Sequence, residues 1–125
     1  MTDDVDINKA IRNDVEAGDP AAAVRANEVA NWTREGAIEA ARAEGLDLGD
    51  EHFAVIELLQ KLYVERGAAP HARYLANILN EEFERQGGSR YLYQLFPGGP
   101  VGQGSRLAGV PAPHDTADLS FGSTY

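Results

Sequence analysis

Two neighbouring stretches of the sequence repeat apolar residues at helical spacing, with only "GAAP" between them. In "EHFAVIELLQKLYVERG" the apolar positions recur every three or four residues, and the preceding Asp50 is a suitable N-cap. Pro70 can open the second stretch, "HARYLANILNEEFERQGG", whose apolar stripe continues until Gly87 and Gly88 end it. Because the connection is so short, the two predicted helices meet at a corner that resembles a helix-turn-helix.

Shorter helical segments flank this pair. "NWTREGAIEAARAEG" offers Asn31 or Thr33 as N-cap and carries a narrow apolar stripe, while "SRYLYQLF" begins with Ser89 as N-cap. Upstream, "PAAAVRANEVANW" supplies Trp32 as its one large apolar anchor, and the spacing in residues 5–15 predicts a weaker helix. The sequence therefore predicts a mainly α fold, a small orthogonal bundle of about four or five helices in one domain.

The C-terminal part of the chain breaks this pattern. The range 98–109 contains five glycines and few large apolar side chains, so its ordering costs more conformational entropy than its own burial returns. We expect a mobile C-terminal arm that needs a groove, either its own or a partner's. The predicted organisation is a weakly defined N-terminal segment at 1–31, a helical core at 32–96 and an arm at 97–125.

Composition excludes several classes of function. The 125 residues contain no cysteine, which rules out disulfides, thiolate nucleophiles, persulfide carriage and thiolate metal sites. The net charge is −9, and residues 1–60 hold the whole excess, with 14 acidic against 5 basic residues. This balance disfavours non-specific attraction to nucleic acid or to a membrane. Since no apolar run has the length of a membrane helix and no signal peptide is evident, we expect a cytoplasmic protein.

Residues with catalytic or metal-binding potential are scattered. His52, His71 and His114 lack partners at the spacing that a metal site on one helix requires. Ser105, His114 and Asp115 could be written as a catalytic triad, but a triad needs rigid support and these residues fall in the predicted arm. We therefore expect no metal, no cofactor and no catalytic site.

The helix after "GAAP" suggests a different class of function. If the corner were a true helix-turn-helix, Arg73 and Tyr74 could contact nucleic acid, because the second helix of that motif enters the major groove. The same helix carries three glutamates against two arginines, which is a poor electrostatic footprint for such a ligand. A nucleic-acid-binding regulator is therefore the second interpretation.

One series of motifs runs from Trp32 to about Thr116: "GDEHFAVIELLQKLYVERGAAPHARYL", "SRYLYQLFPGGP" and "QGSRLAGVPAP". In order and spacing it resembles the DsrC/TusE/DsvC family, which comprises the gamma subunit of dissimilatory sulfite reductase and its sulfur-relay relatives. The resemblance implies a small helical fold with a helix-turn-helix-like element and a mobile C-terminal arm. The N-terminal β-hairpin of the family is not evident in residues 1–31.

The resemblance also implies where the working thiols of the family would fall. The near-terminal cysteine, which carries sulfur, corresponds to Thr116, and the second arm cysteine corresponds to Ser105. A hydroxyl forms neither a persulfide nor a disulfide, because that chemistry needs an accessible thiolate. In addition, Gly102 stands where the family commonly has lysine, and "DLSFGSTY" extends the chain past the usual end.

Three interpretations follow from the resemblance and the missing thiols. The first is a non-catalytic protein that docks on a sulfur-pathway partner, such as sulfite reductase or a sulfurtransferase, and regulates or competes with the true carrier. Its candidate partner-binding residues are Tyr93, Pro97, Gln103, Arg106 and Pro111. Tyr91 and Phe96 are expected to pack the root of the arm. The second interpretation is the nucleic-acid-binding regulator, and the third is a sulfurtransferase proper. The oligomeric state stays open.

Overall fold

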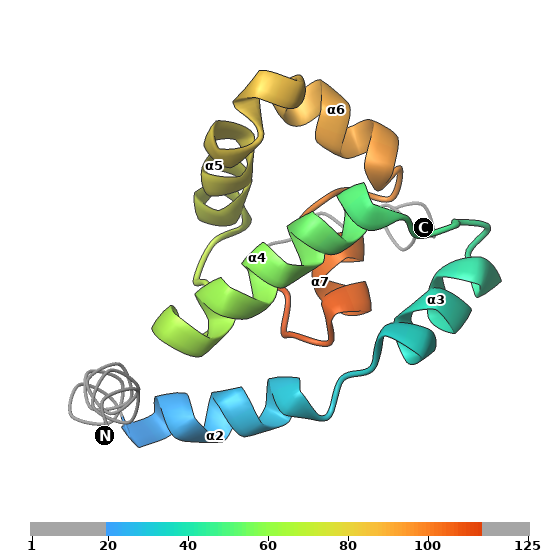
Figure 1. Ribbon diagram of the computed structural model, residues 1–125. Helices are drawn as coiled ribbons and strands as arrows, with labels where there is room; N and C mark the ends of the chain where they lie inside the picture. Colours follow the sequence, from blue (N-terminus) through green and yellow to red (C-terminus); the bar gives the residue numbers. More distant parts are fainter. Residues whose placement is uncertain (1–19, 114–125) are drawn as a thin grey trace, which may run out of the picture.

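The computed structural model describes residues 20–113, and every regular element in that range is helical (Figure 1). The elements are α2 (Pro20–Ala30), α3 (Arg34–Ala43), α4 (Asp50–Arg66), α5 (Ala72–Glu82), the 3-10 turn η1 (Glu84–Gln86), α6 (Gly88–Leu95) and α7 (Gly102–Ala108). The expectation of a mainly α fold is confirmed. The helix predicted at 5–15 lies outside the described residues, and the N-terminal segment is described from Pro20 onward, where it forms α2.

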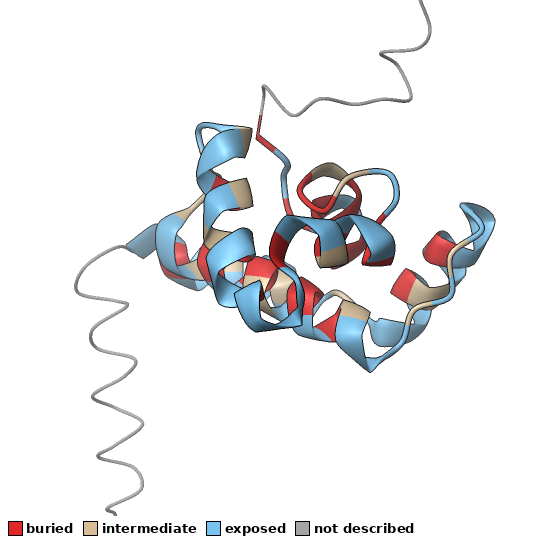
Figure 2. Cartoon of the chain, turned by 90° about the horizontal axis from the view of Figure 1, so that it is seen from above, coloured by how far each residue is buried: buried red, intermediate tan, exposed pale blue. Residues whose placement is uncertain are grey.

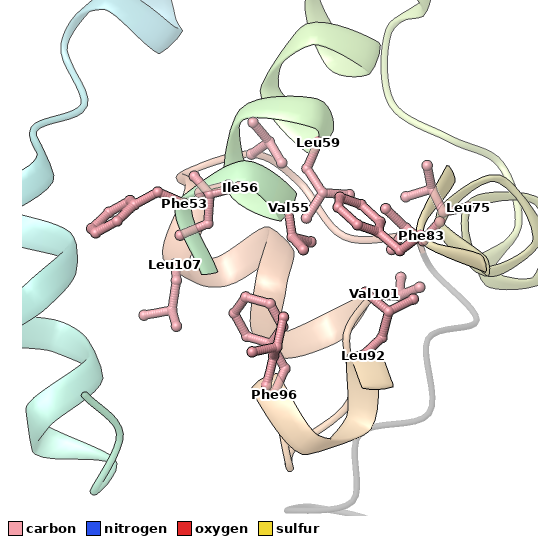
Figure 3. Close-up of a cluster of buried hydrophobic side chains, with 14 of the residues drawn as sticks. Phe53, Val55, Ile56, Leu59, Leu75, Phe83, Leu92, Phe96, Val101 and Leu107 are labelled. Atoms are coloured by element: carbon pink, nitrogen blue, oxygen red, sulfur yellow. The ribbon is translucent and has the colours of Figure 1, made fainter. Parts of the chain in front are cut away.

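The longest helix, α4, lies in the middle, with α5 and α6 above it and α2 below it in Figure 1. It packs against α2 and α7, while α5 packs against α6 and α3 against α7. Figure 2 shows the buried residues mostly on the sides of the helices that face one another and the exposed residues on the outer sides. One apolar cluster joins the helices (Figure 3), and its least exposed members include Ala41, Val55, Ile56, Leu59, Leu79, Leu92, Phe96 and Ala108. The periodic stripes of the sequence are therefore the faces that form the core.

At the starts of α3 and α4, a side chain three residues away in the sequence supplies the capping hydrogen bond. Of the two N-caps considered for α3, the structure uses Thr33, whose hydroxyl accepts the Gly36 N–H at 3.0 Å. Asp50 was predicted as the N-cap of α4 but is its first helical residue, and Gly49 is the N-cap. The reason is that His52 Nδ1 accepts the Gly49 N–H at 3.0 Å, which supplies the cap from inside the first turn.

The next two helices also begin differently from the prediction. Pro70 does not open α5, which starts at Ala72 with His71 as N-cap. Ser89 is not the N-cap of α6 but lies in its first turn, and its N–H is accepted at 2.8 Å by Asn80 Oδ1 from α5. A neighbouring helix therefore caps α6, which no local sequence signal indicates.

The predicted mobile arm needs correction over its described part, because residues 102–108 form a buried helix. Five of the seven residues of α7 are buried: Gln103, Gly104, Ser105, Leu107 and Ala108. The glycine at 104 permits close approach, since a Cβ there would lie 3.0 Å from Leu59 Cδ1 of α4. The groove that the arm was expected to need is thus provided by the chain itself. Packing on α4 offsets the conformational entropy that residues 102–108 lose when they form the helix.

We expect Gly88→Ala to destabilise the fold strongly. Gly88 has φ +61, and a Cβ there would lie 2.5 Å from Asn80 Oδ1, the atom that caps α6. The backbone strain and the damaged cap together should lower the free energy of unfolding by roughly 2 to 3 kcal/mol, measured by urea denaturation. Gly45→Ala is the matched control, because Gly45 has φ +81 with nothing within 4 Å of its Cβ position. It should cost about 1 kcal/mol, and equal losses in both variants would contradict a role for the Asn80 cap.

Candidate docking site around the last helix

The C-terminal end of α7 is held by side-chain donors from other parts of the fold. Trp32 Nε1–H, just before α3, donates to the Leu107 carbonyl at 2.8 Å, and Gln60 Nε2–H of α4 donates to the Ala108 carbonyl at 2.9 Å. Carbonyls in the last turn of a helix have no partner within it, so these bonds satisfy acceptors that would otherwise be buried unpaired. They fix the position of α7 relative to both α3 and α4.

The other end of α7 is held through Gln103. Its side chain is buried, accepts the Gly98 N–H at 2.9 Å and donates to Glu44 Oε1 at 2.7 Å. Glu44, at the end of α3, also pairs with the Arg106 guanidinium at 3.2 Å. Gln103 was predicted as a partner contact, but its amide is engaged inside the chain, where it braces the turn at 97–100.

The other candidate partner-binding residues lie at the surface. Tyr93 on α6 is 55% exposed, and Pro97, Arg106 and Pro111 are exposed as well. The structure brings Arg106 to Glu44 together with Gln103, whereas Pro111 lies at a groove beside Tyr74.

The two residues expected to pack the root of the arm, Tyr91 and Phe96, lie at least partly inside the fold. Phe96 is fully buried, and the half-buried Tyr91 packs a tilted ring on Phe83 at 6.3 Å between centroids. Burial raises the pKa of Tyr91, with a smaller contribution from Glu51. Phe96 also meets the His52 ring edge-on at 5.2 Å, and His52 Nε2 donates to the Leu95 carbonyl at 2.9 Å, because Nδ1 is already an acceptor.

The structure describes one of the two positions that the sequence resemblance equates with thiols. Ser105 lies on the inner side of α7 with no exposed surface, and its Oγ has no hydrogen-bond partner. Any group at this position is closed to solvent while α7 stays packed. Thr116 lies outside the described residues.

The corner between α4 and α5 exposes the residues predicted to contact nucleic acid. Arg73 and Tyr74 line an open hollow together with His71 and Asn77. Tyr74 is 42% exposed, and its hydroxyl accepts a hydrogen bond from Arg66 at 2.6 Å. An aromatic ring and two guanidinium groups are therefore adjacent at this corner.

Helix α2 is fastened to the end of α4 by residues that the sequence analysis did not single out. Arg25 Nε donates to the Tyr63 carbonyl at 2.8 Å, and its NH2 donates to the Val64 carbonyl at 2.9 Å. The Tyr63 hydroxyl donates to Glu28 Oε1 at 2.6 Å. That hydrogen bond, followed by burial, raises the pKa of Tyr63 above its ordinary value.

Gln60 could have been recognised from the sequence. It follows Ile56 by four residues, on the apolar face of its helix, and a polar residue at such a position needs a buried partner. The donor from Trp32 and the cap from Asn80 have no comparable signal, because both partners are distant in sequence.

Within the described residues 20–113, no three His, Asp or Glu side chains gather closely enough to hold a metal ion. None of the helices described has both the length and the apolarity needed to cross a membrane.

Comparison with known proteins gives a consistent result. A family model described as "DsrC like protein" matches residues 24–116. The chain is 38% identical over 87 residues to proteins named sulfurtransferase TusE from Salmonella typhimurium and from Escherichia coli K12, covering 69% of this chain and 80% of each relative. It is also similar to the NMR structure of Allochromatium vinosum DsrC, with 36% identity, a TM-score of 0.58, and coverage of 69% of this chain and 78% of that one.

We expect Ser105→Ala to stabilise the protein. The substitution removes a buried hydroxyl that has no partner and places a better helix former in α7, so the free energy of unfolding should rise by about 1 kcal/mol in urea denaturation. Ser89→Ala is the control, because the Ser89 hydroxyl has a partner, Asn80 Oδ1, at 3.2 Å, and its loss should not stabilise. A loss of stability in Ser105→Ala would mean that the hydroxyl has a buried partner.

We expect Glu28→Gln to lower the pKa of Tyr63 toward its ordinary value. The neutral phenol is stabilised by donating to Glu28, so this link is intact below about pH 10 and is lost as the pH rises through the raised pKa. Titration of the tyrosine ring carbons by NMR measures the shift, with Tyr63→Phe to assign the signal. Glu65→Gln on the same helix should leave the pKa in place, and an equal effect of both variants would exclude a specific hydrogen bond.

Proposed function

Because the chain belongs to the DsrC family, whose relatives are sulfur-relay proteins, we propose that it docks on a sulfur-pathway protein without carrying sulfur itself. The partner would be a sulfite reductase or a sulfurtransferase in the cytoplasm, and the effect would be to regulate or compete with a carrier that has the thiol.

One observation carries this proposal: the 125 residues contain no cysteine. Sulfur relay passes a sulfur atom between thiolates, so a position in the relay needs a nucleophilic sulfur. Ser105 and Thr116 offer hydroxyls in its place, and the hydroxyl of Ser105 is fully buried. Binding remains available to this chain, whereas the transfer step lacks its reacting atom.

The surface that would dock is held rigidly. Gln103 braces the turn at 97–100, and Glu44 holds the Arg106 guanidinium, so Pro97 and Arg106 are exposed on a fixed backbone. Tyr93 on α6 adds an exposed aromatic ring, a side chain that commonly dominates binding energy at protein interfaces. A surface that is already ordered loses less entropy on binding than a mobile arm does.

A nucleic-acid-binding regulator is the second candidate. The hollow lined by His71, Arg73, Tyr74 and Asn77 supports it, because cationic side chains and an exposed ring suit phosphates and bases. The net charge of −9 weighs against it, since most of the binding free energy for nucleic acid comes from phosphate contacts.

The proposal predicts that the chain competes with the carrier for the sulfurtransferase and takes up no sulfur itself. In a reconstituted relay with a sulfurtransferase and its thiol-bearing carrier, the purified chain should slow transfer of labelled sulfur to the carrier and acquire no label itself. Uptake of label by the wild-type chain would contradict the proposal, as would a transfer rate that the chain leaves unchanged at saturating concentration.

Two exposed tyrosines provide matched variants for the same assay. Tyr93→Ala should weaken the competition on the order of tenfold or more, because an aromatic contact at the centre of an interface is often worth over 1 kcal/mol. Tyr74→Ala removes a similarly exposed ring from the α4–α5 corner and should leave the competition unchanged. Salt-sensitive binding of an oligonucleotide that Arg73→Ala removes, with no competition in the relay, would instead favour the nucleic-acid candidate.

A further inference from the structure

The outer side of α6 is a continuous exposed surface. Its residues follow one another at steps of one, three, one and three positions, which places them along one side of a helix: Ser89, Arg90, Tyr93, Gln94 and Pro97. The opposite side of α6 is buried in the core through Leu92 and Leu95. Figure 1 shows α6 on the side of α4 away from α2. We call the five exposed residues the α6 face.

The fold does not use the side chains at the centre of the α6 face. Among the described residues 20–113, none forms a hydrogen bond or ion pair with the side chain of Arg90, Tyr93 or Gln94. The ring of Tyr93 is 55% exposed. The charge, the ring and the amide of this face are therefore available to a partner.

The charge of this part of the chain is opposite to that of the whole. Residues 85–113 contain Arg85, Arg90 and Arg106 and no carboxylate, although the net charge of the chain is −9. Arg106 pairs with Glu44 of α3. Arg85 and Arg90 are exposed, and no carboxylate of the described chain forms an ion pair with either. The α6 face is thus a cationic surface on an acidic protein.

Two carboxylates limit this cationic region without neutralising it. Glu84 precedes Arg85 on η1, at the N-terminal end of the region. Glu51 raises the pKa of Tyr91, but Tyr91 is half-buried and packs on Phe83, so it is not part of the α6 face. The positive charge therefore points outward from α6.

Both ends of α6 are fixed by other parts of the fold. Asn80 Oδ1 of α5 accepts the Ser89 N–H at 2.8 Å, and His52 Nε2 of α4 donates to the Leu95 carbonyl at 2.9 Å. The α6 face is therefore presented on an ordered backbone, and its binding requires little further ordering of the chain.

We propose that the α6 face binds an acidic segment of the sulfur-pathway partner, with carboxylates on Arg85 and Arg90 and an apolar side chain against Tyr93 and Pro97. The inference rests on the proposed function, because it states the chemistry of the surface that this chain docks on. A guanidinium group binds a carboxylate through two parallel hydrogen bonds, and arginine and tyrosine are enriched among the residues that dominate protein interfaces. Nucleic acid fits this face less well, since it needs many phosphate contacts and only two unpaired arginines are present.

A charge reversal tests the inference in the reconstituted relay. Arg90→Glu should weaken the competition tenfold or more, because it places like charges opposite each other. Arg73→Glu is the matched control: it gives the same net charge and lies, also exposed, in the first turn of α5 as Arg90 does in that of α6. A carboxylate in the first turn suits the helix dipole, so both variants should fold.

The relay separates the inference from the proposed function. If the wild-type chain competes, and Arg90→Glu competes as well as it does or no worse than Arg73→Glu, the inference is overturned and the proposed function stands. If the wild-type chain does not compete, the proposed function fails, and a peptide titration decides the inference.

That titration needs no relay partner. The probe is the peptide acetyl-Glu-Asp-Leu-Phe-Asp-Glu-amide, added to the isotope-enriched full-length chain. It should shift the NMR signals of the Arg90, Tyr93 and Gln94 amides and leave those of Arg73 and Tyr74 in place. The neutral peptide acetyl-Gln-Asn-Leu-Phe-Asn-Gln-amide should bind at least about tenfold more weakly. Equal binding of both peptides, shifts at the α4–α5 corner instead, or no binding would overturn the inference.

Other occupants give different results in the same titration. Signals of the α6 face that shift as the concentration of the chain alone is raised would place a second copy there. A short oligothymidylate that displaces the acidic peptide from the α6 face would place nucleic acid there. Either result would overturn recognition of an acidic protein segment.

Discussion

The hydrogen bonds from Trp32 and Gln60 to the carbonyls of Leu107 and Ala108 attach the last helix to the core, and much of the remaining structure depends on that attachment. A helix of seven residues has no independent stability in water, because the cost of its first turn is not recovered over so short a length. It forms in this fold because it packs against α4. Gly104 brings the two backbones close, and Leu107 enters the same apolar cluster as Phe53 and Ile56 (Figure 3).

The helices α3 to α6 were predictable because their apolar stripes directly reflect which face is buried. Their ends were less predictable, for a physical reason. Asp50 and Ser89 have the right local preference for an N-cap, but His52 and the distant Asn80 supply the hydrogen bonds that decide where the helices start. The sequence does not predict α7, because its glycines indicate conformational freedom in the isolated chain, whereas in the fold Gly104 allows close packing on α4.

Part of the candidate site could be predicted from the sequence. The resemblance located two hydroxyls at thiol positions, but only the fold reveals that Ser105 is enclosed with no partner. Among the candidate contacts, Tyr93 and Arg106 are exposed and Gln103 is buried, a difference that residue type does not predict because all three are polar or amphipathic. Gln103 instead joins α7 to Glu44 and to the turn before the helix, so it supports the surface without belonging to it.

The anchors of α7 act on main-chain oxygens, and this has an evolutionary consequence. Every amino acid presents the same carbonyl, so the partners of Trp32 and Gln60 persist whatever side chains occupy positions 107 and 108. The attachment of the helix and the reactivity of the residue at 105 are therefore inherited separately. A lineage could exchange a thiol for a hydroxyl at position 105 in one step, at the cost of one buried hydroxyl without a partner, and still keep the attachment of α7. The scaffold would then remain available to selection for a role other than chemistry.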